Sequence, residues 1–246
     1  MPLTASQAAR YARHIVLKDM GGVGQQKLSA AHVLVIGAGG LGAPVIAYLA
    51  GAGIGRLTIV DPDTVALSNL ARQVIFTEAD LGQPKAEAAA RFVGALNSGL
   101  VVEAVSQPFS TLNGAELLRD VDLAIEGTDR FPTKRLIARI CAQNQVPLVS
   151  GALGQFDGSV TVLAPFLLRE SGKAWPDFEA LYPLDPMPED SPPCELAGVL
   201  NVLPGIIGTM MANEAIKMIA GFGEPLLGRL LVYSARTAQS RIMEYG

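Results

Sequence analysis

The stretch HVLVIGAGGLG, residues 32–42, places a run of apolar residues directly before a turn that contains four glycines. Residues 32–37 are typical of a buried strand, and the segment from Leu41 to about Ala52 is predicted to be a helix. A G-x-G-x-x-G turn between a strand and a helix lets the backbone approach a ligand closely, and the helix N-terminus then offers N–H groups to phosphate. The glycines that form this pattern are Gly37, Gly39, Gly40 and Gly42.

The rest of the chain continues this alternation of strands and helices. Further strands are expected at 57–61, 101–105, 121–127 and 146–151, with helices at 6–18, 83–96, 113–119, 132–144 and 202–220. Residues 158–165 alternate in hydropathy and could pair antiparallel, and the last twenty residues suggest a hairpin. We therefore predict an α/β fold with a Rossmann-like, doubly wound, largely parallel sheet that is extended by antiparallel strands.

Composition narrows the classes of function. The chain has 246 residues, half of them hydrophobic, and a net charge of −4, which argues against a nucleic-acid-binding surface. Two cysteines cannot form a disulfide framework, so a cytoplasmic location is expected. Residues 33–55 carry no charge, but their glycines and Pro44 favour strand, turn and helix over a membrane span. No apolar segment typical of a signal peptide follows the N-terminal arginines.

An aspartate closes the second predicted strand. Asp61 lies 24 residues after Gly37, a spacing that suits an acid holding the hydroxyls of a ribose. The stretch that follows, DPDTVALSNLARQ at residues 61–73, holds more polar groups than a dinucleotide site needs. A solvated acid at a strand end is the alternative interpretation.

Further charged and polar residues are expected at the same edge of the sheet. Asn69, Arg72 and Gln73 follow Asp61, and Lys85 opens the next helix, where a cation opposes the helix dipole. Asp129 follows the fourth strand, and strand ends meet at one carboxyl edge, where such sheets bind ligands. Two cations and an extra acid fit a triphosphate with Mg²⁺ better than a pyrophosphate with nicotinamide. For Arg72 and Lys85 singly, a solvated helix face remains the alternative.

These motifs together carry a family resemblance. The segments GAGGLG, DPDTVALSNLARQ, GQPKAEAA and GTDRFPTKR resemble the ThiF/MoeB/HesA group of E1-like adenylating enzymes. RYARHIVL near the start and CELAGVLNVLPGIIGTMMANEAIKMIAG near the end match the same family, so the resemblance spans nearly the whole chain. It implies one E1-like adenylation domain over residues 1–246. Its parts would be a helical arm (1–30), a nucleotide-binding core (31–165), a crossover loop (166–193) and a helix with a C-terminal hairpin (194–246).

The resemblance also implies an activity. ATP would adenylate the C-terminal Gly-Gly carboxylate of a small ubiquitin-fold sulfur-carrier protein and release pyrophosphate, as a step toward a thiocarboxylate in cofactor biosynthesis. A separate sulfur donor is implied because no rhodanese-like domain is attached. Two alternatives stay open, an NAD(P)-dependent oxidoreductase and a catalytically inactive scaffold that only docks the carrier. A tRNA-modifying relative is disfavoured by the acidic charge balance.

The family's roles can be carried over to matching positions. Asp61 would hold the ribose; Asn69, Arg72 and Lys85 would hold the phosphates, with Ser68 and Gln73 beside them. Asp129 would serve Mg²⁺ and the adenylate. Arg13 would reach the phosphates of the neighbouring subunit in a homodimer.

This sequence departs from many relatives in its cysteines. Those relatives carry two C-x-x-C pairs for a structural zinc, whereas this chain has only Cys141 and Cys194, so no zinc is expected. Cys194 matches a position that bonds covalently to the carrier in some relatives, although a small residue beside a helix start is the simpler interpretation. Cys141 is expected in the core. The proline-rich segment 166–193 is expected to be a functional lid or a disordered loop.

Overall fold

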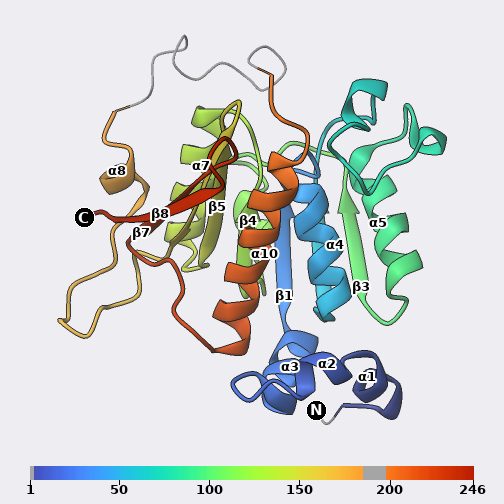
Figure 1. The fold of residues 1–246 in the computed structure, drawn as a ribbon, viewed down its shortest axis with the longest axis horizontal. Helices are drawn as coiled ribbons and strands as arrows, with labels where there is room; N and C mark the ends of the chain where they lie inside the picture. Colours follow the sequence, from blue (N-terminus) through green and yellow to red (C-terminus); the bar gives the residue numbers. More distant parts are fainter. Residues whose placement is uncertain (1–2, 185–197) are drawn as a thin grey trace.

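The computed structural model describes residues 3–184 and 198–246, and its described strands form one continuous sheet (Figure 1). The strands are β1 (His32–Ile36), β2 (Arg56–Val60), β3 (Val101–Val105), β4 (Leu123–Glu126), β5 (Leu148–Leu153), β6 (Asp157–Leu163), β7 (Arg229–Ser234) and β8 (Gln239–Glu244). Their order in the sheet is β3-β2-β1-β4-β5-β6-β7-β8. The pairs from β3 to β5 are parallel and those from β5 to β8 are antiparallel, which confirms the predicted fold class.

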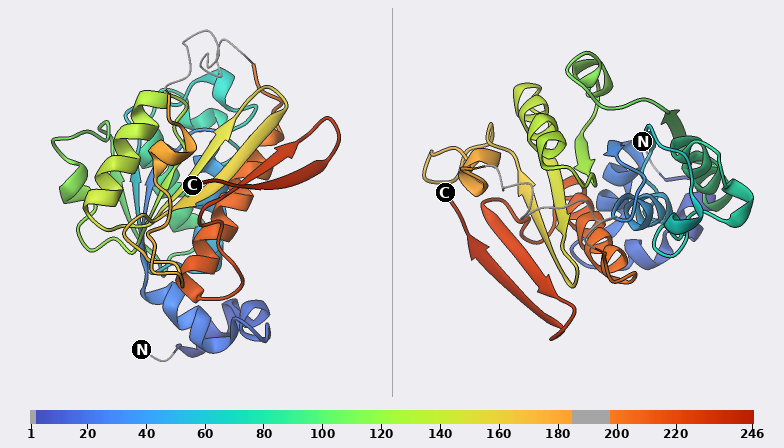
Figure 2. Two further views of the ribbon diagram at one scale, coloured as in Figure 1. Left: turned by 90° about the vertical axis from the view of Figure 1, so that its left-hand side faces the viewer. Right: turned by 90° about the horizontal axis from the view of Figure 1, so that it is seen from above.

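Helices cover both faces of the sheet. The longer ones are α3 (Gly21–Ala30), α4 (Gly42–Ala52), α5 (Lys85–Leu96), α7 (Phe131–Gln143) and α10 (Leu203–Ala220). Shorter ones are α1 (Ala5–Arg10), α2 (Ala12–Ile15), α6 (Gly114–Leu117) and α8 (Phe178–Leu181). Viewed from above, α4, α5 and α10 lie on one face and α6 and α7 on the other (Figure 2). This is the layered arrangement of a doubly wound sheet.

The core follows the two-residue period of the strands. In β1, Val33 and Val35 pack into the hydrophobic cluster that contains α4 and α10, while Leu34 and Ile36 pack into the cluster that contains α7. All four side chains are buried, because each face of the central strand is covered by helices. The continuous apolar run in the sequence reflects this burial on both sides.

The carboxyl ends of the parallel strands and the N-terminal helices lie at opposite edges of the sheet. In Figure 1, β1 and β3 run upward, away from α1–α3, which sit below the sheet. The glycine turn after β1 and the segment after β2 therefore lie at the upper edge. Among the residues that the structure describes, no helix is both long and apolar enough to cross a membrane.

The N-terminal helix expected at 6–18 is instead broken in two. Helix α1 ends at Arg10 and α2 begins at Ala12, with Tyr11 between them. The Tyr11 side chain is buried and its hydroxyl accepts a hydrogen bond from the Asn97 amide at 2.9 Å. That contact, 86 residues away in sequence, accounts for a break that local helix propensity does not predict.

The first part of the crossover segment has a defined structure, contrary to the disordered-loop interpretation. Helix α8 places Phe178 in the core, 5.4 Å from the ring of Phe131 on α7. The guanidinium of Arg169 stacks on the Trp175 ring at 4.9 Å. Residues 166–184 are thus anchored by aromatic contacts. The remainder of the expected loop, including the acids after 184, lies outside the described residues.

Candidate active site

The glycine turn joins β1 to α4 and is shaped by close backbone contacts. Gly37 has a φ of +96°, in the region that glycine adopts without strain. A Cβ on Gly42 would overlap the carbonyl oxygen of Gly37, and a Cβ on Gly40 would lie 3.2 Å from Pro204 of α10. At Gly39 the nearest atom to such a Cβ is the Gln73 amide nitrogen, 3.8 Å away, so this part of the turn is open to a ligand. Gly42 and Gly37 are therefore needed for the turn itself, whereas Gly39 leaves room for a phosphate.

Asp61 ties the end of β2 to the glycine turn. It is 4% exposed, and its two carboxylate oxygens accept hydrogen bonds from Ala38 N at 2.7 Å and Asp63 N at 2.9 Å. Burial raises the pKa of the Asp61 carboxyl above its usual value, while these hydrogen bonds and the Lys85 charge oppose the rise. The bond to Ala38 fixes the spacing between turn and strand end that a nucleotide would span.

Lys85 is held at the same edge by an acid that sequence analysis did not assign to the site. Its ammonium donates to Asp63 Oδ2 at 3.0 Å, and its backbone N–H donates to Asp63 O at 2.9 Å. The Lys85 side chain is 8% exposed and that of Asp63 is 66% exposed. The ion pair thus points a largely buried cation toward Asp63 and solvent at the start of α5.

The segment between β2 and α5 forms a compact loop beside the glycine turn. Asn69 is buried and its side-chain oxygen accepts from Ala66 N at 3.2 Å, so this side chain stabilises the loop's own 3-10 turn. Arg72 donates to the carbonyl of Ser68 at 3.0 Å, and the Ser68 residue is exposed. Gln73 is 3% exposed, and its buried side-chain oxygen has no hydrogen-bond partner.

The unpartnered Gln73 oxygen is informative because buried polar atoms are seldom left without a partner. The Gln73 amide nitrogen is the atom nearest to the open side of Gly39. The same amide group therefore lies beside the part of the turn that can accept a ligand. Because this oxygen is an acceptor, a group that donates a hydrogen bond, such as a hydroxyl or a water molecule, would supply the missing partner.

Asp129 follows β4 at the same edge and is exposed. Two residues before it, Gly127 packs against the glycine turn: its N–H donates to Ile36 O at 3.0 Å, and a Cβ on Gly37 would lie 3.2 Å from its carbonyl carbon. The ends of β1, β2 and β4 therefore bring together the glycine turn, Asp61 and the Asp129 loop, as expected from the sequence.

One predicted site residue with a described position is not part of this cluster. Arg13 lies on α2, exposed, in the helical arm at the amino edge of the sheet, opposite the glycine turn (Figure 1). It therefore does not approach the site of its own chain. Cys194 lies outside the described residues, whereas Cys141 is buried in the core as expected, and burial raises the pKa of its thiol to about 12.

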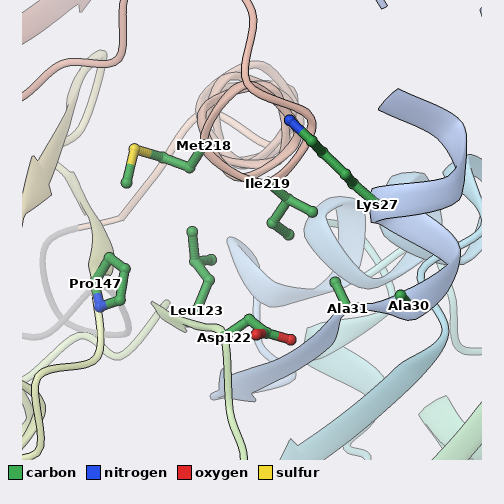
Figure 3. Close-up of a pocket in the computed structure, with 8 residues that line it drawn as sticks. All are labelled: Lys27, Ala30, Ala31, Asp122, Leu123, Pro147, Met218 and Ile219. Atoms are coloured by element: carbon green, nitrogen blue, oxygen red, sulfur yellow. The ribbon is translucent and has the colours of Figure 1, made fainter. Parts of the chain in front are cut away.

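A cavity of about 390 Å³ lies on the amino edge, away from this cluster (Figure 3). Lys27, Asp122 and Ile219 are among the residues that line it. The Lys27 ammonium donates to the carbonyl of Ala220, and Asp122 accepts from His32 N, so the polar groups at its walls are already paired. The described residues of the predicted nucleotide-binding cluster lie at the opposite edge, where open α/β sheets bind ligands.

Sequence analysis missed a buried ion pair at the end of β4. Glu126 is fully buried and Lys134, in the first turns of α7, donates to its two carboxylate oxygens at 2.9 and 3.0 Å. The signal was present in EGTDRFPTK, where an acid ends an apolar strand and a lysine lies in the first turns of the following helix.

Within 3–184 and 198–246, no group of three or more His, Cys, Asp or Glu side chains is placed to hold a metal ion.

Comparison with known proteins agrees with the motifs. The ThiF family matches residues 11–245. A SAMP-activating enzyme E1 from Haloferax volcanii is 43% identical over 96% of this chain and 84% of its own length. A sulfur carrier protein adenylyltransferase from Thermus thermophilus is also 43% identical, over 98% of this chain and 88% of its own. A probable adenylyltransferase/sulfurtransferase MoeZ from Mycobacterium tuberculosis is 42% identical over 95% of this chain and 59% of its own.

Solved structures share the fold at lower identity. PaaA superimposes with a TM-score of 0.82 at 24% identity, covering all of this chain and 76% of PaaA. Escherichia coli MccB with ATP gives a TM-score of 0.81 at 22% identity, covering 96% of this chain and 72% of that protein. The predicted resemblance is confirmed by a family match over almost the whole sequence and by relatives above 40% identity. The chain belongs to the ThiF family.

Proposed function

We propose that this protein adenylates the C-terminal carboxylate of a small ubiquitin-fold sulfur-carrier protein, with ATP as the nucleotide donor. Its relatives in the ThiF family are named for this kind of activity. The observation that carries the proposal is the cluster at the carboxyl edge, where Asp61 bonds to the glycine turn and Asp63 holds the buried Lys85. A nicotinamide enzyme would need the turn and Asp61 but has no evident use for a buried lysine beside them.

The described residues fit ATP. The open side of Gly39 and the N-terminus of α4 suit phosphate, because backbone N–H groups converge there. Asp61 suits the ribose, and Lys85 with Arg72 suits the outer phosphates. Asn69 shapes the loop that carries Arg72, and Ser68 and Gln73 border it. Asp129 would hold Mg²⁺, which would neutralise phosphate charge when bound.

The adenylation step requires no side chain to act as a general base. A C-terminal carboxylate has a pKa of roughly 3.5, so at neutral pH it is ionised and can attack the α-phosphorus without a general base. A new C–O–P linkage forms as the bond from the α-phosphorus to the bridging oxygen breaks, and pyrophosphate leaves with the electron pair. The protein must place the carboxylate in line and balance the negative charge of the phosphates, which is the work of cations and backbone donors.

A homodimer would complete the site. Arg13 lies at the edge opposite the glycine turn of its own chain, so it could act only on the site of a second subunit. An arginine supplied by a partner subunit is an established device in phosphoryl transfer. We therefore propose that the protein forms a homodimer in which Arg13 of one subunit acts on the phosphates bound by the other.

The carrier's tail is proposed to end in Gly-Gly, and its pathway to be cofactor biosynthesis of the molybdopterin or thiamine type, in the cytoplasm. A separate protein would donate sulfur. The proposal includes no structural zinc, and it gives Cys194 no part in adenylation, although a later covalent bond to the carrier is compatible with its position in the sequence.

The proposal is tested by ATP–pyrophosphate exchange with purified protein and a panel of Gly-Gly carriers. Labelled pyrophosphate should enter ATP only when a carrier is present. A carrier whose last glycine is deleted is the matched control and should give no exchange. Tight NAD(P) binding without any exchange would favour the oxidoreductase alternative, and carrier binding without exchange would favour an inactive scaffold; either result would refute the proposal.

A further inference from the structure

A buried polar network lies directly beneath the loop that carries Asp129. At its centre is Glu126, the last residue of β4, with 0% of its surface exposed. Its Oε1 accepts from Thr128 N at 2.6 Å, Thr128 Oγ1 at 2.7 Å and Lys134 Nζ at 2.9 Å. Its Oε2 accepts from Lys134 Nζ at 3.0 Å and Ser150 Oγ at 2.8 Å.

This network joins three elements of the fold. Lys134 belongs to α7, Ser150 belongs to β5, and Lys134 also donates to the carbonyl of Gly151 on β5 at 2.6 Å. Both carboxylate oxygens and the ammonium therefore have protein partners, which offset the cost of burying the charges. The carboxylate of Glu126 is fixed in direction by groups on both sides of it.

The network also reaches the proposed site through a short piece of backbone. Thr128 is bonded to Glu126 by both its N–H and its hydroxyl, and Asp129 is the next residue. On the other side, Gly127 donates to Ile36 O at the start of the glycine turn. Residues 127–129 are thus clamped between the buried ion pair and the turn, while the Asp129 side chain faces solvent at the carboxyl edge.

We propose that Glu126 and Lys134, acting through Thr128, are positioning residues that set the direction in which Asp129 meets the nucleotide. This inference rests on the proposed function and gives the buried ion pair a part in it. None of these three residues is required to touch substrate. They limit the conformations of the loop, so that the Asp129 carboxylate is in place before the nucleotide arrives.

An apolar pair would serve stability alone at least as well. Replacing a buried ion pair by packed apolar side chains is often neutral or stabilising, because desolvating two charges is costly. Lys134 also sits near the N-terminus of α7, where a cation opposes the helix dipole. We therefore explain the ion pair by its effect on the loop: it fixes the backbone of Thr128 and so orients the Asp129 carboxylate, and its contribution to stability alone would not account for it.

The test removes one hydroxyl and leaves the ion pair in place. Thr128→Val deletes the bond from Thr128 Oγ1 to Glu126. The matched control is Thr161→Val on β6, which deletes a hydroxyl that donates to Arg229 O at 2.9 Å and contacts the Tyr245 hydroxyl at 2.7 Å. Two measurements follow: pyrophosphate exchange with a Gly-Gly carrier, and hydrogen–deuterium exchange of residues 127–129.

Thr128→Val should lower kcat on the order of tenfold, the loss expected for one hydrogen bond to a charged group, with the KM for ATP little changed. Asp129→Asn should lower kcat further, and adding Thr128→Val to Asp129→Asn should have no additional effect, because Thr128 acts only through Asp129. Thr161→Val should leave kcat unchanged. If the effects of Thr128→Val and Asp129→Asn multiply, the positioning role is refuted.

Hydrogen–deuterium exchange gives a measurement that is independent of activity. In the wild-type protein the Thr128 amide should be protected, and Thr128→Val should speed exchange over residues 127–129 while Thr161→Val should not. Unchanged exchange in Thr128→Val would overturn the inference whatever the activity. A wild-type protein that shows this protection pattern but no pyrophosphate exchange with any carrier would refute the proposed function and leave the clamp itself supported.

Discussion

Replacing Lys85 by alanine is the most direct perturbation of the proposed site. The substitution removes a cation that is 8% exposed and that is bonded to Asp63 at 3.0 Å. Under the proposed function the same ammonium balances charge on the outer phosphates. Lys85→Ala should therefore reduce the rate of adenylation much more than it reduces the free energy of unfolding.

The expected loss can be worked from the geometry. Two unit charges about 4 Å apart interact with ~4 kcal/mol at an effective dielectric constant of about 20. Asp63 already neutralises part of the charge of Lys85, so we expect the interaction of Lys85 with the phosphates to contribute about 3 kcal/mol. Losing that contribution corresponds to a ~10²-fold fall in kcat/KM. The Lys85–Asp63 pair itself should contribute no more than about 1 kcal/mol to folding, because Asp63 is two-thirds exposed. Tm should then fall by about 2–4 °C.

The assay is pyrophosphate exchange measured alongside thermal unfolding. Lys27→Ala is the matched control, since Lys27 is exposed at the amino edge and bonds only to the carbonyl of Ala220 among the described groups. Its exchange rate should equal that of the wild type. Exchange by Lys85→Ala within a factor of three of the wild type, in a folded protein, would refute the placement of the phosphates at Lys85.

Three further predictions concern other parts of the site. Gly39→Ala should fold normally but bind ATP poorly, because the added methyl would occupy the open space proposed for a phosphate. Gly42→Ala should have a lower Tm, because its methyl would overlap the carbonyl of Gly37; equal Tm values for the two variants in calorimetry would contradict this contrast. The folded pKa of Asp61 is raised above its ordinary value of 3.8, so the free energy of unfolding of the wild type should fall relative to that of Asp61→Asn as pH rises from 3.8 through the folded pKa, and should then level off. Denaturant titrations in which the wild type instead gains stability relative to Asp61→Asn over this range would contradict the sign. Mixing inactive Arg13→Ala and Lys85→Ala subunits should restore up to one working site per heterodimer, and no recovery after verified subunit exchange would exclude the trans role of Arg13.

Most of the fold could be predicted from the sequence because its signals are local. Buried parallel strands appear as short apolar runs: β1, predicted at 32–37, spans His32–Ile36, and all five of its residues are buried. The glycine turn is equally local, since Gly37 and Gly42 contact each other within one turn. The position of Asp61 follows from the length of the intervening helix and strand.

What the sequence could not predict depends on distant contacts. The break at Tyr11 requires Asn97, and the order of residues 166–184 requires Phe131 on α7 as a partner for Phe178. Glu126 and Lys134 are only eight residues apart, but their burial depends on β5, where Ser150 bonds to Glu126 and the carbonyl of Gly151 bonds to Lys134. In each case the deciding energy comes from packing or from desolvation, which no window of sequence contains.

The position of β1 in the middle of the sheet has a consequence for how the protein reaches its active form. β1 pairs with β2 and with β4, and the hydrogen bond from His32 N to Asp122 that precedes the β4 pairing spans 90 residues. Chain closure over such separations is slow, so proteins rich in these pairings fold over milliseconds to seconds, whereas a hairpin such as β7–β8 can form in about 1–10 μs. The glycine turn, Asp61 and Asp129 acquire their mutual geometry only when both parallel pairings exist. During refolding, the capacity to bind nucleotide should therefore appear with the last parallel strand and well after the first hairpin.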